Sequence, residues 1–459
     1  MEPHRSSAPN RQALNAVDRL MLVGHKALRS VGHGGFQCQA HAWCRGRIDA
    51  NRLARAIRRL HGYYPIVTAR LDEPGRRGVP HWMLRPDAVP VLNEAQATSA
   101  EDRAVQAFGE RLFASPMDLD RVDPITFHLL HLPDGRDVFM LHFSHVLMDG
   151  KAPEYVLFEL SRCYDEANDS APPPAPLEPT GVDDLAAHLF RFPFKRRFKA
   201  GLSVIRSHIR LPERPIVMTP PDKMDWICEP YGIAVRHLSD EDTERVIARS
   251  KRICGFQNLT PLILASAFRA VARLSAHPQS ETSLFQTDVP LNLRAPGRMS
   301  PIFRNFMSFV SMEIRRRDLR DREEASRHLY THLRSQISRS MDLGNEQLMS
   351  ALAPSASLME RHIRSRAKKM PSTFGFGFLG PIIAGLERFC GQETEMIYTV
   401  NSALSPPGIT LQVNQYRGRL NAMITYIVGP VSRAVADEFL DLFVDDLRRD
   451  DPPQLAGKG

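Results

Sequence analysis

The stretch LHFSHVLMDG, residues 141–150, ends an apolar run with a histidine, three residues, an aspartate and a glycine. Side chains alternate between the two faces of a strand. If residues 138–145 form a strand, Phe139, Leu141 and Phe143 lie on the same face as His145. At the end of such a strand, burial lowers the pKa of an imidazole and keeps it neutral near pH 7. A neutral imidazole can take a proton from a hydroxyl or an amine, so His145 is a candidate general base.

Two plainer interpretations compete with this one. A single histidine among apolar residues is more often a hydrogen-bonded core residue, and the residues alone favour that reading. Asp149 could face His145, or it could pair with an arginine and hold the loop. His142 points away from His145, and the same alternation separates His128 from His131, so the spacing predicts no metal site.

The elements around this motif are strands and helices in alternation. Residues 36–44 alternate as a half-buried strand, and residues 50–65 predict a helix with Leu53, Ile57 and Leu60 on one stripe. Residues 125–143 predict two strands joined by a turn at Pro133-Asp134-Gly135, and residues 152–167 an amphipathic helix.

The C-terminal part has the same character. Helices are predicted from Ser239, which makes a capping box with Asp242, to about Lys251, from Thr260, and over 323–342 and 432–449. Strands are predicted over 231–239, 282–294, 305–315, 395–403 and 408–428. Mixed strands and helices in both parts predict two α/β sandwiches side by side.

Length and composition set the frame. A chain of 459 residues has two or three domains, or one large fold of two halves. The proline-rich segment 171–181 predicts a boundary. We therefore expect an N-terminal lobe over 1–170, a proline-rich and basic linker over 171–225, and a C-terminal lobe over 226–459.

Charge and cysteine content narrow the class of protein. The net charge of +8 is mild for this length, and no zinc-finger or RNA-binding motif is present, so nucleic-acid binding is not expected. Six cysteines without a Cys-x-x-Cys pair fit a reducing compartment. The N-terminus lacks a signal-peptide core, and no apolar run is long enough to span a bilayer. We expect a cytoplasmic protein.

The His-x-x-x-Asp-Gly motif, between an apolar strand and an amphipathic helix, resembles the core motif of the condensation-domain and CoA-dependent acyltransferase superfamily. This superfamily includes wax ester synthases, polyketide-associated acyltransferases and the plant BAHD enzymes. Further segments resemble it in the same order along nearly the whole chain. They are an opening helix and strand at 46–71, an arginine strand at 288–294, an Asn-Phe strand at 303–310, a glycine-rich segment at 373–381, and crossover and closing strands at 405–426.

The resemblance implies an α/β (α+β) fold of two chloramphenicol-acetyltransferase-like lobes that form a V with a central tunnel. His145 would deprotonate an alcohol or amine acceptor, including a lipid-type acceptor, for attack on the thioester of an acyl-CoA or acyl carrier protein. No cofactor would be bound, since the CoA or phosphopantetheine thioester is a co-substrate. Asp149 would be structural and held by Arg294, and Gly150 would let the backbone approach the reacting centre. The residues expected at the tunnel are Ser144, Asn305, Gly377, Gly380 and Asn401.

One position departs from the family pattern. Many members have two consecutive histidines, and Ser144 replaces the first of them. The rival hypothesis is therefore a catalytically idle module that binds a carrier protein or a lipid. The segment from Gly375 to Gly380 also spells the dinucleotide pattern Gly-x-Gly-x-x-Gly, but no apolar strand precedes it, and we reject that reading.

Two basic segments have open interpretations. Residues 188–211 hold seven Lys or Arg, four Phe and no acid, which fits either peripheral membrane contact or a solvated bridge between lobes. Residues 361–369 could bind the phosphates of CoA or an acidic carrier, or could be a solvated helix end.

Overall fold

The computed structural model describes residues 11–75, 78–166, 184–209, 214–218, 230–255, 259–275, 277–369, 372–403 and 407–450. The predicted lobe boundaries, near residues 170 and 225, lie outside these ranges, so the division of the chain stays a prediction. The predicted linker contains two helices, α5 (Asp184–Phe190) and α6 (Phe194–Ile209).

A six-stranded sheet forms the centre of the N-terminal part, in the order β12-β13-β2-β7-β6-β5. The predicted turn at Pro133-Asp134-Gly135 joins the antiparallel pair β6 and β7, while β5 and β6 run parallel. The strands are β2 (Gln37–Cys44), β5 (Leu92–Gln96), β6 (Ile125–His131), β7 (Asp137–Ser144), β12 (Arg388–Phe389) and β13 (Gln392–Asn401).

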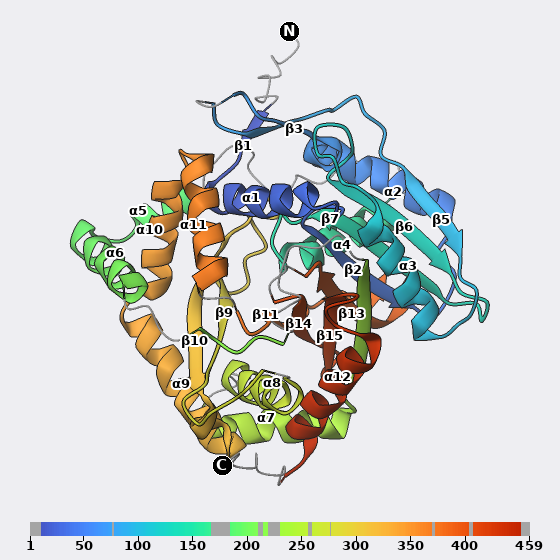
Figure 1. Cartoon of the computed structure of the whole chain (residues 1–459). Coiled ribbons are helices and arrows are strands. Elements are labelled where there is room, and N and C mark those ends of the chain that lie inside the picture. Colours follow the sequence, from blue (N-terminus) through green and yellow to red (C-terminus); the bar gives the residue numbers. More distant parts are fainter. Residues whose placement is uncertain are drawn as a thin grey trace.

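The two faces of β7 enter different cores, as the alternation predicts. Phe139, Leu141 and Phe143 pack with α2 (Ala50–Tyr63) and α4 (Ala152–Glu166), which cover one face of the sheet (Figure 1). Val138 and Met140 pack on the other face, with α3 (Asp102–Ala114). The second core also contains residues of β8 (Tyr231–His237) and β15 (Arg419–Ile427), so it joins the N-terminal sheet to the C-terminal part.

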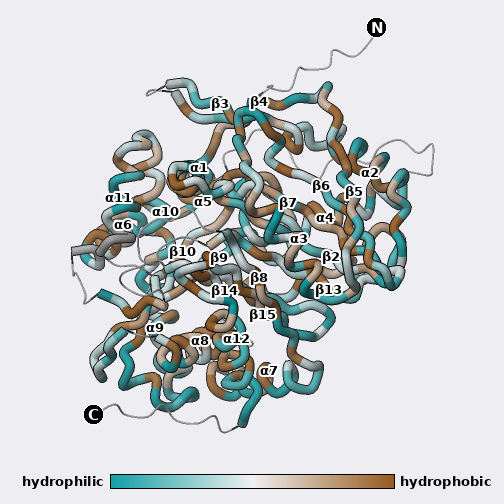
Figure 2. The backbone as a smooth tube through the Cα atoms, turned by 45° about the vertical axis from the view of Figure 1, so that its right-hand side comes forward, coloured by the Kyte–Doolittle hydropathy of each residue, from teal (hydrophilic) through white to brown (hydrophobic). Residues whose placement is uncertain are grey.

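The C-terminal part is built on a four-stranded sheet, β11-β14-β15-β8, and a two-stranded sheet, β10-β9. Helix α7 (Asp240–Cys254) begins at the predicted cap, where Ser239 accepts a hydrogen bond from the amide of Asp242. Hydrophobic residues line the interior, especially along α8 (Figure 2). The other elements are α8 (Thr260–Leu274), β9 (Leu284–Asn292), β10 (Met307–Arg315), α9 (Arg322–Ser338), β11 (Gly375–Pro381), β14 (Ile409–Tyr416) and α12 (Arg433–Arg448).

Two strands of the later chain, β12 and β13, complete the N-terminal sheet. β13 pairs antiparallel with β2, with Tyr398 opposite His41. The next strand along the chain, β14, returns to the C-terminal sheet. The six-stranded sheet therefore combines segments some 350 residues apart in sequence. Cutting the chain into an N-terminal and a C-terminal range does not separate the two sheets.

A helical layer lies over the junction of the two parts. It consists of α1 (Ala16–Ser30), α10 (Met341–Leu352) and α11 (Ala356–Lys369), which contact one another, and α6 packs on α10 (Figure 1). A small sheet of β1 (Arg11–Ala13), β4 (His81–Met83) and β3 (Arg70–Asp72) lies near the start of α1. None of the helices in the described part of the chain has the length and hydrophobicity needed to cross a bilayer.

Candidate active site

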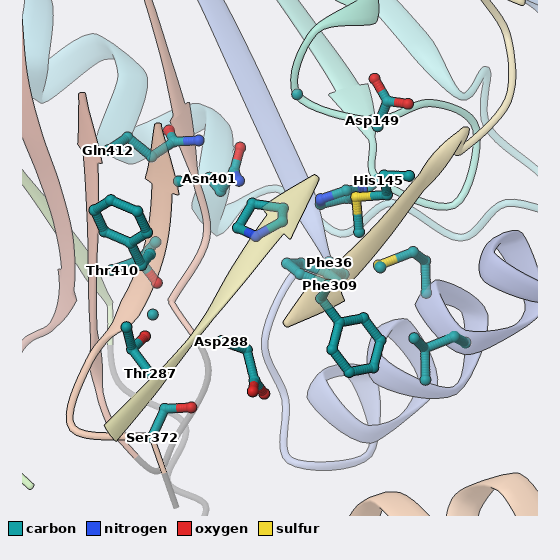
Figure 3. A pocket seen from close by; sticks show the side chains of 18 of the residues that line it. Phe36, His145, Asp149, Thr287, Asp288, Phe309, Ser372, Asn401, Thr410 and Gln412 are labelled. Carbon is teal, nitrogen blue, oxygen red and sulfur yellow. The ribbon is translucent and has the colours of Figure 1, made fainter. Parts of the chain in front are cut away.

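A cavity of about 430 Å³ lies where the two parts and the helical layer meet. His145, Asp149 and Gly150 line it from the loop after β7, and Gly377 and Gln412 line it from β11 and β14 (Figure 3). Much of the remaining wall is apolar, with Phe36, Leu20, Met21, Met307, Phe309, Met349, Phe376 and Phe378. The cavity can therefore receive a molecule with an apolar segment.

His145 is fixed just beyond the end of β7. Its backbone N–H donates to the carbonyl of Phe36 at 2.9 Å, and the two rings lie 4.7 Å apart between centroids. The residue is only 6% exposed, yet its side chain is part of the cavity wall. Burial lowers the pKa of His145 below its ordinary value of 6.5, the direction expected from the sequence.

Asn305 fixes the tautomer of His145. The amide nitrogen of Asn305 donates to Asp18 Oδ1 at 2.9 Å and to the carbonyl of His145 at 2.8 Å. The amide oxygen must therefore be the atom 3.1 Å from His145 Nδ1. An amide oxygen only accepts, so Nδ1 carries the proton and Nε2 keeps a lone pair. This tautomer is the one in which His145 can accept a proton at Nε2.

Asp18 holds Asn305 in this orientation, and no pattern in the sequence pointed to Asp18 as a site residue. Its Oδ1 accepts from both the backbone N–H and the side-chain amide of Asn305, each at 2.9 Å. Its Oδ2 accepts from the backbone of Asn15, which closes the capping box of α1. Burial raises the pKa of Asp18 to about 6. The Asn15-x-x-Asp18 spacing signals a helix start, but burial of the aspartate beside the motif is visible only in three dimensions.

Asp149 forms the ion pair with Arg294 that the resemblance implies, at 2.8 Å, with both side chains buried. The same carboxylate oxygen accepts from the backbone N–H of Phe306 at 2.9 Å. The other oxygen accepts from the backbone N–H groups of Lys151 and Ala152 at the start of α4. Arg294 also donates twice to the carbonyl of Pro301. Asp149 therefore caps a helix and ties the motif loop to the C-terminal part, and it does not hydrogen-bond the imidazole in the described structure.

The side chain of Ser144 lies away from the cavity, because it points to one face of β7 and the side chain of His145 points to the other. It is fully buried, and its hydroxyl oxygen accepts from the backbone N–H of Val146 at 3.2 Å. The serine thus braces the turn after the strand. Gly150 lies on the wall, where a Cβ would come 3.1 Å from a methyl of Leu379, so a side chain there would narrow the cavity.

The other residues predicted at the tunnel separate into two groups. Gly377 and Asn401 line the cavity. Asn305 lies behind His145, and Gly380 lies outside the lining, at a register shift of β11 with a φ of 68° that favours glycine.

Two amide oxygens in the cavity wall lack hydrogen-bond partners. They are Oδ1 of Asn401 and Oε1 of Gln412, and both are buried. Figure 3 shows the two side chains at the same end of the pocket, beyond His145. Unpartnered buried oxygens of this kind are rare and costly, and rotation of either amide would turn its oxygen toward the cavity and a ligand N–H or O–H. The strand pattern gave no signal for Gln412.

In the described ranges, no three His, Cys, Asp or Glu side chains gather as a metal site. From the basic segment 361–369, His362 and Ile363 line the cavity, while Arg364 pairs with Glu360 at the surface. Phosphate binding by this segment stays a prediction.

Part of the chain matches a protein-family model, and nearly the whole chain is similar to solved structures. Residues 28–200 match the family model of the condensation domain. The first condensation domain of the CDA synthetase is similar over 95% of both chains, with a TM-score of 0.72 and 16% identity. The cyclization-docking bidomain of a peptide synthetase from Sorangium cellulosum has a TM-score of 0.69 at 16% identity, over 97% of this chain and 86% of that one. No curated protein matches.

An acetyltransferase is similar as well. Trichothecene 15-O-acetyltransferase from Fusarium sporotrichioides has a TM-score of 0.68 at 12% identity, over 95% of both chains. At such identities the structural likeness shows the fold, so the predicted fold of two chloramphenicol-acetyltransferase-like lobes is confirmed. The match at residues 28–200 and these structures bear out the resemblance to the condensation-domain and acyltransferase superfamily.

Proposed function

We propose that the protein is an acyltransferase that moves an acyl group from a thioester to an alcohol or an amine, with His145 as the general base. The observation that carries the proposal is the imidazole on the cavity wall, with its Nδ1 proton donated to Asn305 and its Nε2 left as an acceptor. Burial favours the neutral ring, which is the form that a base needs near neutral pH.

In the proposed reaction, His145 takes one proton from the acceptor and later gives it to the leaving thiolate. Nε2 takes the proton of the acceptor hydroxyl or amine as its oxygen or nitrogen attacks the thioester carbonyl. The tetrahedral intermediate then expels the thiolate, and the imidazolium returns the proton to sulfur. The acyl group has then passed from sulfur to the acceptor, and the thiol leaves. The chemistry depends on alignment of the two substrates and requires no bound cofactor.

The donor is a thioester of CoA or of a carrier-bound phosphopantetheine. The free oxygens of Asn401 and Gln412 support a donor arm that contains amide N–H groups, because those groups supply what the wall lacks. The apolar wall supports an acyl chain or a lipid-type acceptor. The similar solved proteins include condensation domains of peptide synthetases and an O-acetyltransferase, which supports both kinds of acceptor.

The test is thiol release with a panel of acyl-CoAs, carrier-bound thioesters, alcohols and amines. We expect His145→Ala to lower turnover at least about a hundredfold, since the base contributes on that scale. His328→Ala, which changes an exposed histidine on α9, is the matched control and should keep full activity. Thermal unfolding of each variant checks the fold.

Two results would count against the proposal. Thiol release that survives His145→Ala would remove the base assignment. Absence of turnover with every donor, together with binding of a carrier protein, would favour the idle-module alternative. The orientation of Ser144 supports an active protein, because the serine braces the turn and leaves the position of His145 intact.

A further inference from the structure

We infer that the outer face of α5 and α6 is a contact surface for an anionic lipid membrane. The inference is independent of acyl transfer, since it depends on a surface outside the cavity. The surface belongs to the described part of segment 188–211, for which peripheral membrane contact is one of the two predictions from the sequence.

An apolar ridge runs along this surface. Phe190, Phe194, Phe198 and Ile205 are 68%, 74%, 63% and 54% exposed. At roughly 100° per residue, positions 194, 198 and 205 fall within roughly 40° of one another around α6. The rings of Phe194 and Phe198 are stacked, 6.2 Å apart between centroids. Single exposed apolar residues are ordinary, whereas four along one edge mark an interaction surface.

The opposite face of α6 is fixed to the protein. Ala200 and Val204 are buried, and both lie against Gly344 of α10. A Cβ at Gly344 would come 2.5 Å from the carbonyl oxygen of Ala200, so the two helices touch at backbone distance. The ridge therefore cannot turn inward. Helices α5 and α6 lie at the left edge of the molecule in Figure 1.

Cationic side chains flank the ridge on both sides. Helical geometry places Lys195, Lys199 and Arg206 along one flank. On the other flank, the guanidinium of Arg197 lies 4.7 Å from the ring centre of Phe190 and 6.0 Å from that of Phe194. Residues 188–209 contain no acid. Long basic side chains can reach anionic headgroups while the apolar crest enters the acyl boundary.

The position of the ridge favours a membrane over an acidic carrier protein. A carrier has to dock over the cavity that receives its thioester. α6 lies outside α10, the helix whose Met349 lines the cavity, so the ridge faces away from it. A bilayer at the ridge would lie one helix away from the cavity.

Co-sedimentation with vesicles tests the inference on the full chain. We expect binding to vesicles of phosphatidylcholine and phosphatidylglycerol in equal parts, and much weaker binding to phosphatidylcholine alone. Lys195→Gln with Lys199→Gln should weaken binding to the anionic vesicles about thirtyfold, and should reduce its salt dependence. Phe194→Ser with Phe198→Ser should weaken binding at low and high salt alike.

Matched variants lie elsewhere on the surface. Ile337→Ser changes an apolar residue of α9 that is 49% exposed, and Arg55→Gln with Arg58→Gln removes two exposed charges from α2. Both should bind vesicles like the unmodified protein. Absence of vesicle binding, or equal loss in the matched variants, would overturn the inference. Retention by an acidic carrier protein without lipid, lost on Phe194→Ser with Phe198→Ser, would replace the membrane with a protein partner.

Discussion

At the scale of single residues, the central feature is the buried chain from Asp18 through Asn305 to His145. Each link has one possible direction, because the carboxylate and the amide oxygen only accept. The resemblance led to His145 and Asp149 through the short motif, and to Arg294 through the arginine strand at 288–294. It did not lead to Asp18, whose role depends on α1 lying across the loop that carries Asn305.

Asn305→Ala tests this chain. Loss of the acceptor at Nδ1 removes a contact that stabilises the imidazolium, so we expect the pKa of His145 to fall further. In the unmodified protein, kcat/KM should decrease as the pH falls through a pKa below 6.5, because the ring then takes up a proton. In Asn305→Ala this decrease should occur at lower pH, with kcat reduced about tenfold. A reduced kcat with an unchanged pH profile would mean that Asn305 acts on the fold alone.

Gln412→Leu tests the unpartnered oxygen in the cavity wall. The change removes a buried acceptor without a partner, so we expect the free energy of unfolding to stay equal or rise by about 1 kcal/mol. KM for the thioester donor should rise about fivefold to tenfold, because one hydrogen bond to the donor is lost. Gln415→Leu, on the same strand but outside the cavity lining, is the control and should leave KM unchanged. An unchanged KM in Gln412→Leu would remove this residue from the donor site.

At the scale of elements, periodicity predicted β2, α2, the β6–β7 hairpin and α4 close to their observed bounds. Helix α2 buries one stripe against a core, and the alternating residues of β2 and β7 enter two different cores, so their patterns carry the signal. The residues of β2 predicted a half-buried strand, but both of its faces are buried. The layer of α1, α10 and α11 was missed, although α1 has a capping box. Its helices pack partly on one another and around a cavity, although α1 buries Val17, Met21 and Leu28 along one stripe.

The buried histidines of β2 and β7 make a prediction at this scale. Burial lowers the pKa of His41 and His142 to about 3 from 6.5. Below pH 6.5 these rings take up protons in the unfolded chain but not in the folded one, so stability falls as the pH falls. Each ring should lower the free energy of unfolding by about 2 kcal/mol between pH 6.5 and about pH 5.

Urea unfolding across this pH range measures the effect. His142→Gln should reduce the pH dependence by the share of one ring, because glutamine does not titrate. His328→Gln, at an exposed histidine, should leave the pH dependence as it was. If the free energy of unfolding changes equally with pH in the unmodified protein and in His142→Gln, the ring of His142 does not contribute to the pH dependence.

At the scale of the whole molecule, one buried ion pair joins the halves beside the cavity. Asp149 belongs to the N-terminal part and Arg294 to the C-terminal part, and their side chains are 4% and 1% exposed. The sequence suggested the pair through the resemblance, but it could not place the two halves relative to each other. That arrangement comes from long-range packing around α3 and the strands β8 and β15.

Arg294→Ala should lower the free energy of unfolding by about 3–5 kcal/mol, since it leaves a buried carboxylate without its cation. Arg245→Ala breaks an exposed pair with Asp242 and should cost less than about 1 kcal/mol. The midpoint of urea unfolding, measured for both variants, makes the comparison. Equal midpoints would mean that the pair does not hold the halves together.

The pairing of β13 with β2 has a consequence for synthesis on the ribosome. Until residue 401 has been translated, β2 lacks its neighbour on one side, and its open edge can recruit other nascent chains. A fragment that stops near residue 170 should therefore aggregate, and adding a peptide of residues 388–401 should keep it in solution.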